Sequence, residues 1–89
     1  MEKNIYDSYG LDDFQFDLAK ELYEENKSVV CSYSLEEVDR EIAECWLEDT
    51  DDEDYKKFLS IALNNCAEIY TLTDHLGDFT QPIGEFVVY

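Results

Sequence analysis

Carboxylates crowd into one segment of this 89-residue chain, residues 36–54. Eleven of these 19 residues are Asp or Glu, and Arg40 is the only base, whereas an even spread of the 23 acidic residues would place about five there. Acidic runs of this kind are usual in disordered tails. This run, however, contains Trp46, coincides with a segment of helical spacing and the turn after it, and is followed by Tyr55 and Phe58. We therefore expect the chain to build its core next to its strongest negative charge.

The net charge of −17 is set against a substantial apolar fraction. Chains with high charge and few hydrophobic residues stay unfolded, but 45% of this chain is hydrophobic and 15% is aromatic. We therefore expect one folded domain over residues 1–89. Repulsion among the carboxylates weakens the compact state, and solubility needs a net charge of only about 2–8 in magnitude. The excess charge therefore indicates a use beyond solubility.

Apolar residues at helical spacing predict a first helix over residues 11–26, with Phe14, Leu18 and Leu22 on one face. Two later segments open with the patterns S-x-x-E and T-x-x-E, which are typical of a capping box at the start of a helix. They predict a second helix over residues 34–48 and a third from Thr50 to about residue 75. Since the link between these two helices is short, we expect them to pack together.

Two segments rich in β-branched and aromatic residues predict strands at residues 28–33 and 85–89. Pro and Gly predict a turn at residues 81–84 before the second strand. We expect the two strands to pair and the helices to cover one face of the sheet. Residues 68–73 also tolerate an extended form, whereas residues 1–10 look like an irregular lead-in. The expected fold is α+β, with about three helices in the order αβααβ packed on a short antiparallel sheet.

Four glutamates of the expected second helix step by four, three and four residues: Glu37, Glu41, Glu44 and Glu48. At 3.6 residues per turn they form a stripe about 60° wide. Like charges four residues apart destabilise a helix by some tenths of a kcal/mol, and a helix selected only for stability would interleave lysines. A second group continues the stripe around the next turn: Asp49, Asp51, Asp52, Glu53 and Asp54. We predict that these nine side chains bind a partner, with a merely solvated face as the alternative.

Metal binding and catalysis are less well supported by the sequence. A calcium loop of the EF-hand type that begins at Asp49 would need Gly in place of Asp54 and Glu in place of Ser60. His75, the only histidine, is expected in the last turn of the third helix rather than beside a cysteine as a catalytic base. No motif of a nucleotide-binding or hydrolytic enzyme is present. We therefore expect no enzymatic activity, no cofactor and no specific metal site, and a divalent-cation module is only a third alternative.

The three cysteines and the apolar pattern bear on localisation. Cys31, Cys45 and Cys66 are odd in number and lack C-x-x-C spacing, which indicates reduced thiols. We expect them to be small core residues rather than zinc ligands. The N-terminus lacks the apolar stretch of a signal peptide, and no apolar run reaches the length of a membrane span. These features predict a cytoplasmic protein.

The sign of the charge limits the partners. DNA, RNA and anionic membranes would be repelled, so we expect no direct nucleic acid binding and no membrane association. The expected partner is a basic protein surface. Seven tyrosines are many for this length, and we expect some of them to be exposed, because tyrosine is enriched at protein interfaces.

In its acidity, its many tyrosines and its carboxylate-lined helix, the chain resembles the small DNA-mimic proteins of phages and mobile elements, the anti-CRISPR and antirestriction class. The resemblance is one of composition and includes no specific family motif. It implies a non-enzymatic inhibitor in the host bacterial cytoplasm that occupies the DNA-binding surface of a nuclease complex. The alternative is an antitoxin or immunity protein that neutralises a basic toxin.

Overall fold

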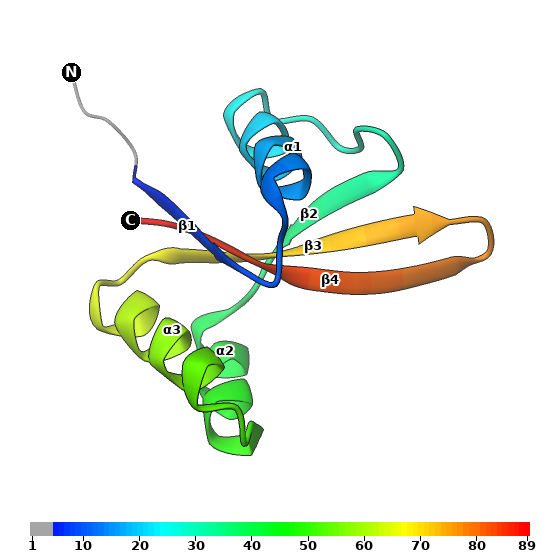
Figure 1. The fold of residues 1–89 in the computed structure, drawn as a ribbon. Coiled ribbons are helices and arrows are strands. Elements are labelled where there is room, and N and C mark those ends of the chain that lie inside the picture. Colours follow the sequence, from blue (N-terminus) through cyan, green and yellow to red (C-terminus); the bar gives the residue numbers. More distant parts are fainter. Residues whose placement is uncertain (1–4) are drawn as a thin grey trace.

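The structure is a computed structural model that describes residues 5–89, apart from the Leu76 side chain. Within this range it contains three helices and an antiparallel sheet of four strands, which confirms the expected α+β class (Figure 1). The elements follow in this order: β1 (Tyr6–Tyr9), α1 (Asp13–Glu24), β2 (Tyr33–Glu37), α2 (Arg40–Asp49), α3 (Glu53–Asn64), β3 (Glu68–Leu76) and β4 (Phe79–Val88). None of these helices is long and apolar enough to cross a membrane.

The sheet has the strand order β1-β4-β3-β2, and helices cover both of its faces (Figure 1). Helix α1 lies on one face, and α2 and α3 lie together on the other. The expectation that helices cover one face was therefore wrong. Strand β4 shows the reason, because Phe86 and Val88 pack on the α1 side while Val87 packs on the α2–α3 side. The sequence of a strand that is buried on both faces is continuously apolar, whereas a strand buried on one face alternates apolar and polar residues.

Each face of the sheet has its own apolar core. The core on the α1 side consists of these buried residues: Ala19, Leu22, Leu72, Phe86 and Val88. The core on the other side consists of Ala43, Phe58, Leu59, Ala62, Leu63, Ile69 and Val87. Tyr6 stacks on Phe86 with ring centroids 5.3 Å apart, which closes the α1-side core near β1. The second core anchors α2 and α3 to the sheet.

Helix α1 forms where the sequence predicts it. Asp12 caps the helix by accepting a hydrogen bond from the backbone amide of Gln15 at 2.7 Å, and the Gln15 side chain accepts one from the Asp12 amide at 3.1 Å. This reciprocal pair is a capping box. Leu18 and Leu22 are buried as expected, together with Ala19, whereas Phe14, which was expected on the same face, is 60% exposed.

The second helix begins later than expected, at Arg40. Residues 33–37 form β2 instead and pair with β3, from Tyr33 opposite Asp74 to Glu37 opposite Tyr70. The expected strand at residues 28–33 therefore lies mostly before the real one, and its expected pairing with the C-terminal strand is wrong. Ladder pairing to a strand more than 30 residues away decides this segment, and the local S-x-x-E pattern does not reveal it.

The third helix is shorter than expected and ends at Asn64. Strand β3 follows, so residues 68–73 are extended, as their β-branched residues allowed. Cys66 precedes it with a left-handed backbone φ of 55°. Asp52 rather than Thr50 caps α3, since its side chain accepts hydrogen bonds from the amides of Asp54 and Tyr55.

The expected turn at residues 81–84 lies inside β4. Pro82 pairs opposite Thr73 and Gly84 opposite Leu72, so the register shifts by one residue between them. The Pro and Gly therefore mark a β-bulge, where such residues are common within strands. Residues 6–9 of the expected irregular lead-in form β1, and residues 1–4 lie outside the described residues.

Candidate functional site

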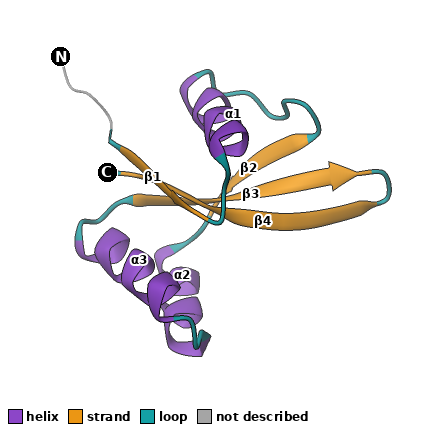
Figure 2. Ribbon diagram, viewed as in Figure 1, coloured by secondary structure: helices purple, strands orange, loops and turns teal. Residues whose placement is uncertain are grey.

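Helices α2 and α3 bring most of the predicted carboxylates together. Only residues 50–52 separate the two helices, which lie side by side, away from α1 (Figure 2). All nine predicted site residues are exposed. Eight of them lie on α2, on the link or on the first turn of α3, and we call them the acidic surface: Glu41, Glu44, Glu48, Asp49, Asp51, Asp52, Glu53 and Asp54.

Glu37, the ninth predicted residue, does not belong to this surface. It lies on strand β2 opposite Tyr70, and its negative charge contributes to raising the pKa of the Tyr70 hydroxyl, after burial and Glu68. The stripe on α2 therefore has three members rather than four: Glu41, Glu44 and Glu48. These three still fall within about 60° around the helix.

The opposite side of α2 explains why these carboxylates face solvent. Ala43 is fully buried, and Trp46 and Leu47 pack half-buried against the same core. Helix α3 is held on that core by Phe58 and Leu59. The acidic surface is therefore carried by two helices that are each fixed to the sheet by their apolar faces.

Asp52 has a structural role within the acidic surface. Its carboxylate accepts hydrogen bonds from the amides of Asp54 at 3.0 Å and Tyr55 at 3.3 Å, and a short one from the Tyr9 hydroxyl. The Tyr9 hydrogen bond, followed by that of the Tyr55 amide, holds the pKa of Asp52 below its usual value. Glu53 and Asp54 lie in the first turn of α3, where the helix dipole favours negative charge. Local stability therefore accounts for these three carboxylates without a partner.

The remaining carboxylates have little compensation. Arg40 lies 3.7 Å from Glu44, and Lys56 lies 3.9 Å from Glu53. Both pairs are exposed, and such pairs contribute little to stability. Within residues 5–89, six members of the acidic surface have no ion-pair partner. Asp52 and Asp54 are two of them, and the other four are Glu41, Glu48, Asp49 and Asp51. Glu41 lies in the first turn of α2, where the helix dipole favours negative charge. Neither the fold nor a neighbouring base explains the other three, Glu48, Asp49 and Asp51.

Tyrosines brace the acidic surface against the sheet instead of lying exposed beside it. All seven tyrosines are half-buried, so the expectation of exposed ones was wrong. The rings of Tyr9 and Tyr55 lie 5.1 Å apart, and the Tyr55 hydroxyl donates to Glu85 on β4 at 2.8 Å. The hydrogen bond to Asp52, with smaller effects of burial and nearby carboxylates, raises the pKa of Tyr9 to about 12. Burial and Glu85 raise the pKa of Tyr55 as well.

The cysteines and His75 also differ from expectation. Cys31, Cys45 and Cys66 are all exposed rather than core residues. His75 lies on β3 rather than in a helix, with its Nε2 2.6 Å from the Ser34 hydroxyl oxygen. Across the described part of the chain, no three His, Cys, Asp or Glu side chains converge where a metal ion could be held.

Sequence reasoning missed a cleft of about 420 Å³ between α2 and the sheet. Its walls include Ile42 and Trp46 of α2 and Thr71, Thr73 and His75 of β3. The residues at 71, 73 and 75 alternate along the strand, and this period of two was the one signal in the sequence that could have placed them on a common face.

The acidic surface presents carboxylate oxygens, which suit the N–H donors of Lys and Arg side chains. Glu48 and Asp49 lie on a helix that Ala43 fixes to the sheet, so the fold sets their positions. Comparison of the chain with protein-family models, with curated protein sequences and with solved structures finds no match.

Proposed function

We propose that this chain is a non-enzymatic binding protein whose acidic surface occupies the nucleic-acid-binding face of a basic protein. The proposed target is a bacterial defence nuclease, and the mode is that of anti-CRISPR and antirestriction DNA mimics. One observation carries the proposal: eight exposed carboxylates lie on two packed helices and the link between them, with only Arg40 and Lys56 as ion-pair partners among residues 5–89.

The spacing of the α2 carboxylates supports this proposal. Steps of three or four residues correspond to about 4.5–6 Å along a helix axis, and the phosphates of one DNA strand follow every 3.4 Å of axis. The stripe from Glu41 to Glu48 spans about 10 Å. It can thus meet a few Lys or Arg side chains that would otherwise contact successive phosphates.

The support beneath the charges favours binding over simple solvation. A disordered acidic tail would lose conformational entropy when it binds, whereas helices fixed by Ala43, Phe58 and Leu59 lose little. A concentrated negative surface also speeds association with a basic partner, and salt slows that association. The proposal therefore includes affinity that falls as salt rises.

The test uses two variants that both change the net charge from −17 to −14. The test variant replaces the three stripe carboxylates: Glu41→Gln, Glu44→Gln and Glu48→Gln. The control variant replaces three exposed carboxylates on other parts of the surface: Asp13→Asn, Asp17→Asn and Asp78→Asn. Each tagged protein is incubated with bacterial lysate, and bound proteins are eluted with duplex DNA and identified by mass spectrometry.

We expect the wild type and the control variant to retain one nucleic-acid-binding nuclease that duplex DNA or high salt elutes, and the test variant to lose it. Equal retention by the test variant would contradict the proposal. Retention of a small basic toxin that DNA does not elute would favour the antitoxin or immunity alternative.

A further inference from the structure

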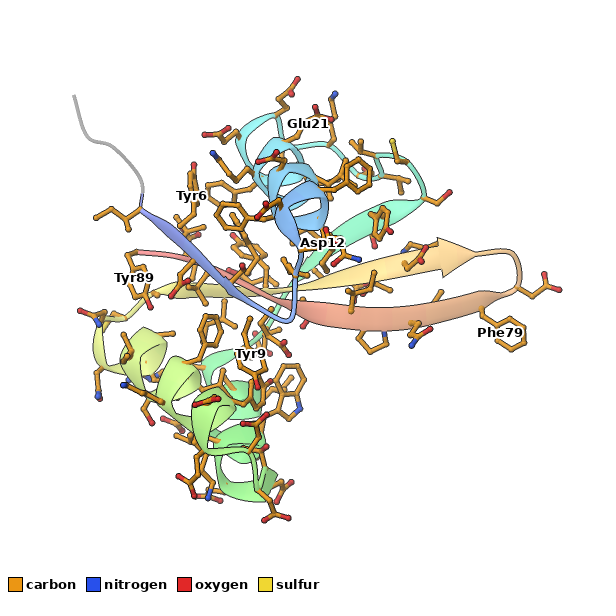
Figure 3. The ribbon with its side chains drawn as sticks, viewed as in Figure 1. Tyr6, Tyr9, Asp12, Glu21, Phe79 and Tyr89 are labelled. Atoms are coloured by element: carbon orange, nitrogen blue, oxygen red, sulfur yellow. The ribbon has the colours of Figure 1, made fainter. Side chains whose placement is uncertain are left out.

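The cleft beside α2 lies where the sheet extends past its helices. Figure 2 shows that the β3–β4 hairpin continues beyond α2 and α3, which cover only part of that face. In Figure 3, Phe79 lies at the far end of this hairpin. The cleft volume of about 420 Å³ falls within the range of about 300–1,000 Å³ that is usual for ligand sites.

Apolar, polar and acidic side chains line the cleft, and each kind would contact a different part of one ligand. Ile42 and Trp46 of α2 form an apolar and aromatic wall. Polar residues of β3, namely Thr71, Thr73 and His75, form the opposite wall together with Pro82 of β4. Glu36 of β2 pairs opposite Thr71 and so supplies the acidic side chain on this face of the sheet, and no Lys or Arg is among the described residues that line the cleft. A ligand that fits all three is apolar along its length and cationic at its end.

Thr71 provides a second, independent observation. Its Oγ1 is buried and, among the residues described, has no hydrogen-bond partner. A buried hydroxyl without a partner costs stability, and this one belongs to the cleft wall. Rotation about χ1 moves the hydroxyl to another staggered position, so the oxygen can turn to accept a hydrogen bond from a donor in the cleft.

We propose that the cleft receives one arginine side chain of the protein partner. The aliphatic part of the arginine packs on Ile42 and Pro82, and the planar guanidinium stacks on the indole of Trp46. Its N–H groups donate to Thr71 Oγ1 and to the carboxylate of Glu36. Lysine fits less well, because it offers no plane for stacking and is more strongly hydrated. This inference rests on the proposed function in one respect, that the partner is basic.

The chain provides its own probe for this site, since Trp46 is its only tryptophan and lies in the cleft wall. The full chain is titrated with N-acetyl-L-arginine amide while tryptophan fluorescence is recorded. N-acetyl-L-citrulline amide, which has the same shape without the charge, is the matched control ligand. We expect a saturable change with a Kd on the order of 1 mM for the arginine compound and at least about tenfold weaker binding of the citrulline compound.

Two substitutions test the proposed contacts. Thr71→Val removes the hydroxyl with little change of shape, and we expect binding about tenfold weaker with no loss of folding by circular dichroism. Glu36→Gln should also weaken binding, whereas Asp17→Asn makes the same charge change on α1, on the other face of the sheet, and should not. Titrations that fail to saturate, equal binding of citrulline, or wild-type binding by both cleft variants would overturn the proposal.

No partner protein is present in this titration. A negative result would therefore overturn the arginine site alone. Equal DNA-eluted capture by the wild type and the stripe variant would overturn the proposed function alone.

Discussion

The last turn of α2 carries negative charge where its own stability opposes it. Glu48 and Asp49 lie in this turn, which contains no basic residue. The C-terminal end of a helix has a partial negative charge, so carboxylates are unfavourable there. Glu48 also lies one turn from Glu44, and like charges at this spacing repel. Replacing Glu48 with lysine should therefore stabilise the protein.

The size of this gain follows from two effects. Removing a carboxylate from the helix end and adding a cation each contribute about 0.3–1 kcal/mol. Losing the repulsion between Glu48 and Glu44 contributes about 0.2–0.5 kcal/mol, and gaining an attraction between the new lysine and Glu44 contributes about 0.2–0.5 kcal/mol more. Allowing for solvent screening, the sum for Glu48→Lys is about 1–2 kcal/mol, which corresponds to an increase in Tm of about 5–10 °C for a domain of this size.

The assay is thermal unfolding followed by circular dichroism, at low salt and at about 1 M NaCl, where the Debye length falls to about 3 Å. Asp78→Lys, on the turn between β3 and β4, is the matched control because both variants change the net charge from −17 to −15. We expect the gain of Glu48→Lys over the control to be largest at low salt and to shrink at high salt. A Tm equal to or below that of the control would refute the reasoning.

Three further outcomes follow from the fold. Phe86→Ala should lower the free energy of unfolding by about 3–5 kcal/mol in urea titrations, because Phe86 is fully buried among aromatic rings. Gly84→Ala should loosen β1 and speed its amide exchange, because a Cβ there would collide with the Tyr9 carbonyl oxygen. The folded pKa of Tyr9, about 12, lies above its ordinary value of 10.0, so its hydrogen bond stabilises the fold fully below pH 10 and is lost as pH rises through about 12. Tyr9→Phe should therefore reduce the loss of stability over this pH range, as measured by urea unfolding at each pH.

Local signals in the sequence predicted some elements well. Helix α1 is specified by Asp12, Gln15 and the spacing of Leu18 and Leu22, all within a few turns of one another. The exposure of the α2 carboxylates is equally local, because a helix that buries Ala43 must turn its opposite side to solvent.

Pairing between distant strands could not be predicted from such local signals. Residues 33–37 include a helix-start pattern, yet they pair with β3 and form an edge strand of the sheet. The same error placed Glu37 on α2 and gave the stripe a fourth member. Pro82 and Gly84 suggested a turn because a bulge and a turn use the same residues, and only the register against β3 distinguishes them.

The cleft could not be predicted for a similar reason. Trp46, Thr71, Pro82 and Glu36 come from four different elements, and only the packing of α2 against one part of the sheet brings them together. The sequence indicated that Trp46 belongs to the core. In the structure Trp46 is half-buried against the core and also lines the cleft.

The most direct test of the central claim is protection of phage DNA in cells. Phage plating efficiency is measured on hosts that each carry one restriction or CRISPR nuclease and express the wild type, the α2 stripe variant or the matched control variant. We predict that the wild type and the control restore plating on a host whose nuclease they capture, and that the stripe variant does not. Equal restoration by the stripe variant, or none by a wild-type protein that captures the nuclease, would contradict inhibition through the acidic surface.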